Sequence, residues 1–83
     1  MYYVYLLQGR GGFLYVGSTS DLRRRFSEHN NREELSTKYY APFRLIYYEA
    51  YCDKKDALIR ERSLKHHSSA IGHLKRRIKN ILK

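Results

Sequence analysis

Residues 2–29 read YYVYLLQGRGGFLYVGSTSDLRRRFSEH, and this stretch decides the fold class of the chain. Residues 2–8 are mostly aromatic, aliphatic or β-branched and contain no helix breaker, which predicts a strand. Residues 9–12 (GRGG) supply glycines for the positive-φ positions of a hairpin loop. Residues 13–18 form the returning strand. The stretch therefore predicts a β-hairpin followed by a basic helix.

The hairpin register determines which side chains face each other. With the loop centred near Arg10, Tyr5 is expected opposite Tyr15 on one face of the sheet. Tyr3 is then expected opposite Gly17. Because Gly17 has no side chain, it leaves room for a ligand to approach the backbone.

The helix predicted over residues 21–29 carries charged groups on its packed face. Leu22 and Phe26 are spaced i, i+4 and mark the side that contacts the sheet. Arg25 and His29 complete the same i, i+3, i+4, i+7 stripe. An ordinary surface helix would place its charges on the outer face, so these two residues are candidates for a functional site.

The rest of the chain predicts a third strand and two more helices. The polar residues 30–37 form a loop, residues 43–51 a strand, and residues 69–82 the last helix. Asp53 is a plausible N-cap for the helix between them, which packs Ala57, Leu58 and Leu64 inward. Glu61 lies within that apolar stripe, so a carboxylate is expected among the packed side chains.

Length and composition limit the class of protein. Eighty-three residues predict one small domain, spanning residues 1–83, and a net charge of +9 favours a polyanionic partner, with nucleic acid ahead of a membrane surface or an acidic protein. Cys52 is the only cysteine, so no internal disulfide can form, which is typical of a cytoplasmic protein. Neither a membrane-spanning run of apolar residues nor a signal peptide is predicted.

The polar residues at apolar positions form one set with a common chemistry. Burying such groups singly is costly, so we expect them to share a site or to open onto a cleft. A guanidinium can hold phosphate oxygens and a carboxylate can hold a divalent cation, a combination suited to phosphate esters. The set consists of Tyr5, Tyr15, Arg25, His29 and Glu61.

Several ordered motifs in the chain resemble the GIY-YIG nuclease domain family. Residues 3–5 (YVY) and 15–17 (YVG) match its two name-giving motifs, and residues 17–25 and His29 follow its spacing. Residues 37–39, 45–49 and 57–65 resemble its small stand-alone branch, the UPF0213 or YhbQ-like proteins. The resemblance covers residues 2 to 66 and implies an α+β fold, a three-stranded antiparallel sheet flanked by helices.

The resemblance also implies a function and a role for each candidate residue. It implies a metal-dependent endonuclease that hydrolyses DNA phosphodiester bonds, acting in repair or recombination. One Mg²⁺ (or Mn²⁺) ion would be held by Glu61, while Tyr5 or Tyr15 orients or deprotonates the attacking water. Arg25 would stabilise the transition-state charge, and His29 would relay a proton or contact phosphate.

DNA is the partner that the charge and the resemblance imply together. The residues expected to contact its backbone near the site are Gly17, Arg23, Arg24, Arg32, Lys38 and Lys65. We expect a monomer, with repair proteins as candidate partners. The basic face of the last helix is expected to make further backbone contacts or simply to be solvated.

Each candidate residue also has an ordinary structural explanation. The two phenols can form a cross-strand aromatic pair, Arg25 can pair with Asp21, and Glu61 can pair with Lys65 at i+4. The chain departs from the family pattern at Tyr3, which replaces a glycine, and offers no assignable asparagine after Glu61. The alternative function is therefore a catalytically weak or inactive nucleic-acid-binding module on the same fold.

Overall fold

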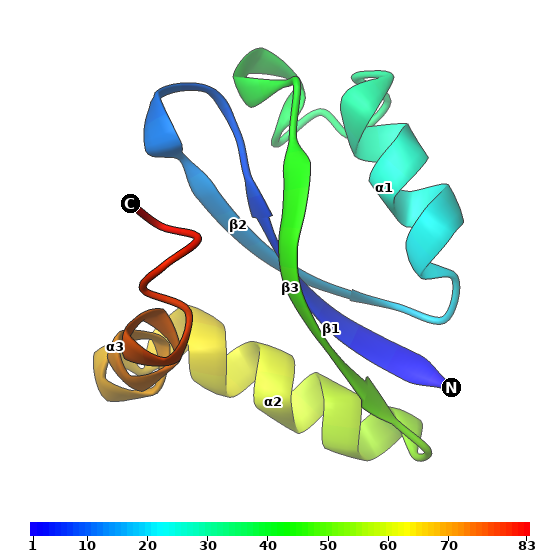
Figure 1. The fold of residues 1–83 in the computed structure, drawn as a ribbon. Coiled ribbons are helices and arrows are strands. Elements are labelled where there is room, and N and C mark those ends of the chain that lie inside the picture. Colours follow the sequence, from blue (N-terminus) through cyan, green and yellow to red (C-terminus); the bar gives the residue numbers. More distant parts are fainter.

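Three strands and three helices make up the structure (Figure 1), a computed structural model that describes all residues, 1–83. The strands form one antiparallel sheet in the order β2-β1-β3, so the predicted α+β fold is confirmed. The strands and α-helices are β1 (Tyr2–Gln8), β2 (Leu14–Thr19), α1 (Leu22–Asn30), β3 (Arg44–Tyr51), α2 (Lys54–His66) and α3 (Ser68–Arg77). Two short 3-10 helices, η1 (Arg10–Gly12) and η2 (Lys38–Tyr40), lie in the connections between them.

The central strand β1 separates two apolar clusters, because successive side chains point to opposite faces of a sheet. Val4 and Leu6 pack with the buried residues of α2 and α3. Tyr5 and Leu7 point the other way and pack with Leu22 and Phe26 of α1 as well as with the chain before β3. Figure 1 shows the result: α1 lies on one side of the sheet, and α2 and α3 lie on the other.

The hairpin register differs from the prediction by two residues. Tyr5 pairs with Gly17, not with Tyr15, and Tyr3 pairs with Thr19. The cause is a five-residue loop in which Gly11 and Gly12 both adopt positive φ, so that the turn is centred one residue later than expected. A shift of two keeps every side chain on its predicted face.

The helix boundaries follow local capping. The side chain of Asp21 accepts a hydrogen bond from the backbone N–H of Arg24 and caps the start of α1. The side chain of Asp53 accepts a hydrogen bond from the backbone N–H of Lys55 and caps α2, as predicted. The last helix is shorter than expected, since it ends at Arg77 and continues only as turns. Leu58 was expected to pack inward and is instead 42% exposed.

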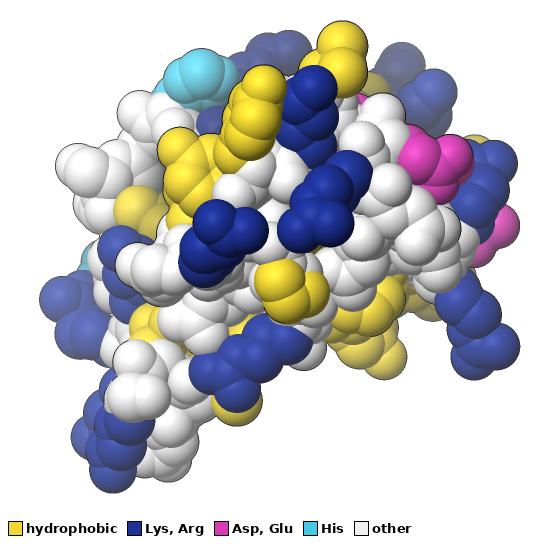
Figure 2. Space-filling view, turned by 90° about the horizontal axis from the view of Figure 1, so that it is seen from above, with side chains coloured by type: hydrophobic (Ala, Val, Ile, Leu, Met, Phe, Trp, Pro, Cys, Tyr) yellow, Lys and Arg dark blue, Asp and Glu magenta, His cyan; other side chains and the backbone are white.

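The chain between α1 and β3 lies at the end of the sheet where the hairpin loop is. Residues 31–37 are irregular as predicted, although Thr37 is fully buried. The backbone of Arg32 has φ of 60°, a left-handed conformation commonly found just after a helix C-terminus. Figure 2 views this end of the molecule from above and shows Lys and Arg side chains gathered around hydrophobic ones.

No helix is long and apolar enough to cross a membrane.

Candidate active site

The observed hairpin register places the Tyr5 phenol directly over Gly17. Tyr5 is only 2% exposed, and a Cβ atom on residue 17 would lie 2.5 Å from Tyr5 Cζ and closer still to the hydroxyl oxygen. The gap predicted beside Gly17 is therefore filled by the protein's own phenol. Tyr15 remains a neighbour of Tyr5 on the same face, with 6.3 Å between the ring centroids.

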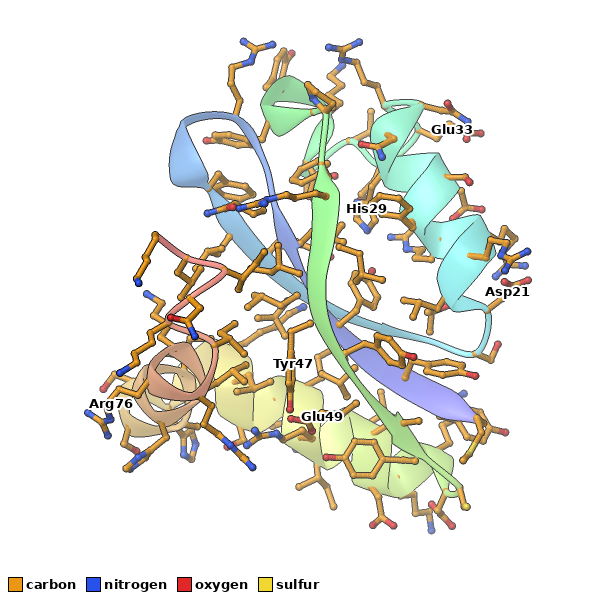
Figure 3. All side chains as sticks on the ribbon, viewed as in Figure 1. Asp21, His29, Glu33, Tyr47, Glu49 and Arg76 are labelled. Carbon is orange, nitrogen blue, oxygen red and sulfur yellow. The ribbon has the colours of Figure 1, made fainter.

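His29 connects this phenol to the loop after α1. Tyr5 Oη lies 3.0 Å from His29 Nε2, and Thr37 Oγ1 lies 2.9 Å from Nδ1. The Thr37 hydroxyl donates to the carbonyl oxygen of Glu34 at 3.5 Å, so it accepts a hydrogen bond from Nδ1–H. Nε2 is then the acceptor for the Tyr5 proton. In Figure 3, His29 lies between α1 and the sheet.

Burial sets the protonation states of both groups. It raises the pKa of Tyr5 to about 12, so the phenol keeps its proton at neutral pH. Burial also lowers the pKa of His29, and the charge of Arg25 lowers it further. The imidazole is therefore neutral at pH 7, the form that can accept a proton.

Arg25 is held by two carboxylates next to this pair. Its guanidinium donates to Glu28 Oε1 at 3.0 Å and to Glu34 Oε2, and not to Asp21 as the structural alternative proposed. The hydrogen bond with Glu34 raises the pKa of Arg25 and lowers the pKa of Glu34. Arg25 tends to lower the pKa of the Tyr5 phenol, in opposition to the effect of burial.

Glu61 reaches the same region from the opposite face of the sheet. Ser18, next to Gly17 on the edge strand β2, donates to Glu61 Oε1 at 2.7 Å. Lys65 Nζ lies 3.0 Å from Glu61 Oε2 and 5.5 Å from the centre of the Tyr15 ring. The Glu61–Lys65 ion pair that offered an ordinary structural explanation for Glu61 is therefore present, and it lies beside Tyr15. The charge of Glu61 also tends to raise the pKa of Tyr5, although burial is the main cause of that shift.

The donor set at Glu61 suits a hard divalent cation. The side chain is 19% exposed and offers carboxylate oxygens beside the Ser18 hydroxyl. No group of three or more His, Cys, Asp or Glu side chains could hold a metal. Magnesium commonly binds through one or two carboxylates and takes its other ligands from water and substrate phosphate. A single glutamate at the edge of a cleft fits that mode of binding.

Comparisons with known proteins identify the family of this chain. The family described as the GIY-YIG catalytic domain matches residues 1–80. The chain belongs to the GIY-YIG family. Relatives include a UPF0213 protein of Streptococcus pneumoniae serotype 4, 38% identical over 64 residues, and one of Lacticaseibacillus paracasei, 41% identical over 68. These matches cover 76% and 78% of this chain, and 65% and 74% of the two relatives.

A solved structure supports the same assignment. The solution NMR structure of a UPF0213 protein from Bacillus halodurans matches with a TM-score of 0.56 and 33% sequence identity. The match covers 89% of this chain and 81% of the other. The chain thus belongs to the small UPF0213 branch of the GIY-YIG family, and this membership supports a nuclease-like function.

The basic residues predicted to contact DNA lie at separate places on the GIY-YIG domain. Lys65 adjoins the cluster through Glu61. Arg32 and Lys38 meet in the loop before β3, where Arg32 Nε donates to the Lys38 carbonyl oxygen at 3.3 Å. Arg23 lines a surface pocket between α1 and β3, while Arg24 is exposed and 3.7 Å from Glu28. Only Lys65 is in direct contact with a predicted catalytic side chain.

A second polar cluster lies on the other side of the sheet. Glu49 accepts hydrogen bonds from Tyr47 and Tyr51, and Arg60 of α2 donates to both of its carboxylate oxygens at 3.0–3.2 Å. Figure 3 shows Tyr47 and Glu49 together between β3 and α2. Because the carboxylate is fully paired, this cluster connects α2 to the sheet and leaves no group free for chemistry.

The structure adds four side chains that the sequence did not identify as part of the site. Ser18 binds Glu61. Thr37 orients His29, and two glutamates hold Arg25. Ser18 and Thr37 lie within the matched motifs 17–25 and 37–39, but the motifs gave them no role in the site. No periodicity or motif in the sequence distinguishes the two glutamates. The two glutamates are Glu28 and Glu34.

The buried His29 should make the stability of the GIY-YIG domain depend on pH. Its pKa is lower in the folded state than the ordinary 6.5, so below about pH 6.5 the unfolded chain binds more protons. The free energy of unfolding should therefore fall as the pH drops from about 7.5 to about 5.5. Urea unfolding at both pH values measures this loss, and an NMR titration should find the imidazole pKa below 6.5.

His29→Gln is the control for this pH dependence, because it removes the titrating group. The Glu34 carboxyl also has a lowered pKa, but its contribution is lost only below its ordinary value of 4.5. The variant should therefore lose less stability than the wild type between the two pH values. An equal loss in both proteins, together with an unshifted imidazole pKa, would contradict the assignment.

Proposed function

We propose that this protein is a metal-dependent endonuclease that hydrolyses phosphodiester bonds in DNA. The observation that carries the proposal is the junction at the β2 edge, where the Ser18–Glu61 hydrogen bond lies one residue from the Tyr5–Gly17 contact. A carboxylate from α2 and a phenol from β1 reach neighbouring residues of β2 there, and the Arg25 guanidinium belongs to α1, the helix on the phenol's side of the sheet. The family membership and the net charge of +9 support the same activity.

In this proposal Tyr5 and His29 work as a proton relay. A phenol with a pKa of about 12 is a poor base by itself, but it can accept a proton from water while it passes its own to the neutral imidazole. The water oxygen then bonds to phosphorus, the P–O bond to the leaving strand breaks, and the leaving oxygen takes up a proton. Thr37 keeps His29 in the required tautomer.

The charged side chains would bind and neutralise the phosphate. Glu61 would hold a Mg²⁺ or Mn²⁺ ion, which supplies Lewis-acid stabilisation of the charge on the leaving oxygen. Arg25 would exchange a glutamate partner for phosphate oxygens, and Lys65 would turn from Glu61 towards the backbone. Gly17, Arg23, Arg24, Arg32 and Lys38 remain proposed backbone contacts. We further propose a cytoplasmic monomer acting in repair or recombination.

A cleavage assay tests the activity directly. Purified protein with magnesium should cut at least one member of a panel of single-stranded, nicked and branched DNA. Arg25→Ala should reduce the rate about 100-fold or more, as loss of one transition-state donor commonly does. The exposed Lys55 is a matched control, and Lys55→Ala should cut at the wild-type rate. Cleavage that survives both Arg25→Ala and Glu61→Ala would overturn the mechanism.

The second candidate function is DNA binding without turnover. It is favoured by the fact that both Arg25 and Glu61 already have partners of opposite charge within the chain. It predicts salt-dependent DNA binding that Glu61→Gln leaves unaffected, and no magnesium-dependent product. The same assay therefore separates the two functions.

A further inference from the structure

An exposed group of aromatic and basic residues covers the end of the sheet that is seen in Figure 2. We call it the platform; it consists of Arg10, Phe13, Arg32, Lys38, Tyr39 and Tyr40. Tyr39 is 73% exposed, so its ring contributes little to the core. Large aromatic side chains left in water in this way often mark a binding surface.

The platform is an ordered surface. The rings of Phe13 and Tyr40 are stacked, with their centres 3.8 Å apart and their planes 10° from parallel. This stack attaches η2 to the hairpin loop. Arg32 Nε donates to the Lys38 carbonyl oxygen, which fixes the start of η2 on the other side. The exposed ring of Tyr39 is thus presented from a fixed backbone.

Cations lie around the exposed ring. Lys38 Nζ lies over one face of the Tyr39 ring, 5.1 Å from its centre, so a base would stack on the opposite face. Arg10 and Arg32 are exposed on the two neighbouring loops. A flat aromatic face bordered by positive charge is the usual surface for unpaired nucleotides, with bases stacked on the ring and phosphates beside the cations. The bases of an intact duplex are already stacked on each other and offer no face to such a ring.

The platform is joined to the proposed catalytic groups by a few bonds. Thr37, the N-cap of η2, hydrogen bonds His29, and Tyr39 follows it by two residues. Glu34, earlier in the same loop, holds Arg25. A nucleotide bound at Tyr39 would therefore contact the loop that positions His29 and Arg25.

We propose that the platform binds an unpaired base of single-stranded DNA by stacking on Tyr39, and so directs the protein to DNA with unpaired nucleotides. The inference rests on the proposed function for its choice of DNA. It adds a substrate preference and a specificity residue that the catalytic cluster does not supply.

Binding without divalent metal tests this inference separately from catalysis. Fluorescence anisotropy would compare a labelled oligothymidylate with a blunt duplex of equal length. Tyr39→Ala should weaken single-strand binding by about 5- to 150-fold and leave duplex binding within about twofold. Tyr39→Phe keeps the ring and should bind as the wild type does. Tyr48→Ala removes another exposed tyrosine, on the far edge strand, and should have no effect.

Lys38→Ala provides a further contrast, since it removes charge and keeps the ring. It should weaken binding to both DNAs and lower the salt dependence by about one unit of slope. Unchanged binding by Tyr39→Ala, an equal loss on both DNAs, or an equal loss in Tyr48→Ala would overturn the inference. If the wild type cleaves no DNA but Tyr39→Ala selectively weakens single-strand binding, the nuclease proposal fails and the proposal for the platform is supported. If the wild type cleaves DNA and Tyr39→Ala binds single strands as the wild type does, the proposal for the platform fails and the nuclease proposal is supported.

Discussion

Glu61→Gln should abolish DNA cleavage while leaving DNA binding intact or slightly tighter. Glutamine keeps the shape and an oxygen to accept the Ser18 hydrogen bond, but it loses the charge that would hold the metal. We expect the rate to fall by about a thousandfold or more, which corresponds to about 4 kcal/mol of transition-state stabilisation. The Lys65 ammonium loses its ion-pair partner and becomes available for phosphate, so affinity should not fall.

The exposed Glu33 provides the matched control, since Glu33→Gln makes the same chemical change outside the cluster. That variant should cleave and bind as the wild type does. Single-turnover cleavage and anisotropy binding on the same DNA would separate the two effects for each protein. If Glu61→Gln still cleaves at more than a few per cent of the wild-type rate, Glu61 is not the metal ligand. If it loses binding as well, its role is structural.

Gly17→Ala should both destabilise the protein and inactivate it. The added Cβ would meet the Tyr5 ring 2.5 Å from Cζ, where no free space exists, so the buried phenol must move. Overpacking of this kind costs about 1–3 kcal/mol of unfolding free energy. Displacement of Tyr5 from His29 also breaks the proposed relay, so activity should be lost even when the protein is folded. Urea unfolding and cleavage assays measure the two effects.

Gly72→Ala is the matched control for this substitution. Gly72 lies within α3 and has no neighbour within 4 Å of a Cβ atom, so alanine should stabilise the helix by about 0.5–1 kcal/mol and leave activity unchanged. A double-mutant cycle with Tyr5→Phe locates the clash, since removal of the hydroxyl should lessen the cost of Gly17→Ala. Additive losses in stability would indicate that the phenol does not lie over Gly17.

Local sequence pattern was sufficient for the elements and for the faces of the sheet. The aromatic, aliphatic and β-branched residues at positions 2–8 predicted the strand, and the i, i+4 spacing of Leu22 and Phe26 predicted the helix that packs on it. Asp21 and Asp53 cap their helices through hydrogen bonds to residues two or three positions away. These interactions span a few residues, so the sequence alone contains the information that specifies them.

The hairpin register could not be predicted from the local sequence. Glycines predicted a loop, but whether the turn is centred at residue 10 or 11 depends on which backbone conformations Gly11 and Gly12 adopt. A displacement of two residues preserves the faces and costs no burial, so the hydrophobic pattern cannot exclude it. It nevertheless changes the partner of Tyr5 from a second phenol to Gly17, and with it the reason for that glycine.

Polar residue types at apolar positions indicated the five candidate catalytic residues, the family motifs suggested a role for each, and the charge indicated the class of partner. Their partners came only from the folded chain: Ser18 for Glu61, Thr37 for His29, and Glu28 and Glu34 for Arg25. A hydrogen bond or an ion pair requires atoms within about 3–4 Å. Ser18 and Glu61 are 43 residues apart in the sequence, whereas the other pairs are separated by three to nine residues. Such distances follow from the packing of both helical layers on the sheet, which no local pattern encodes.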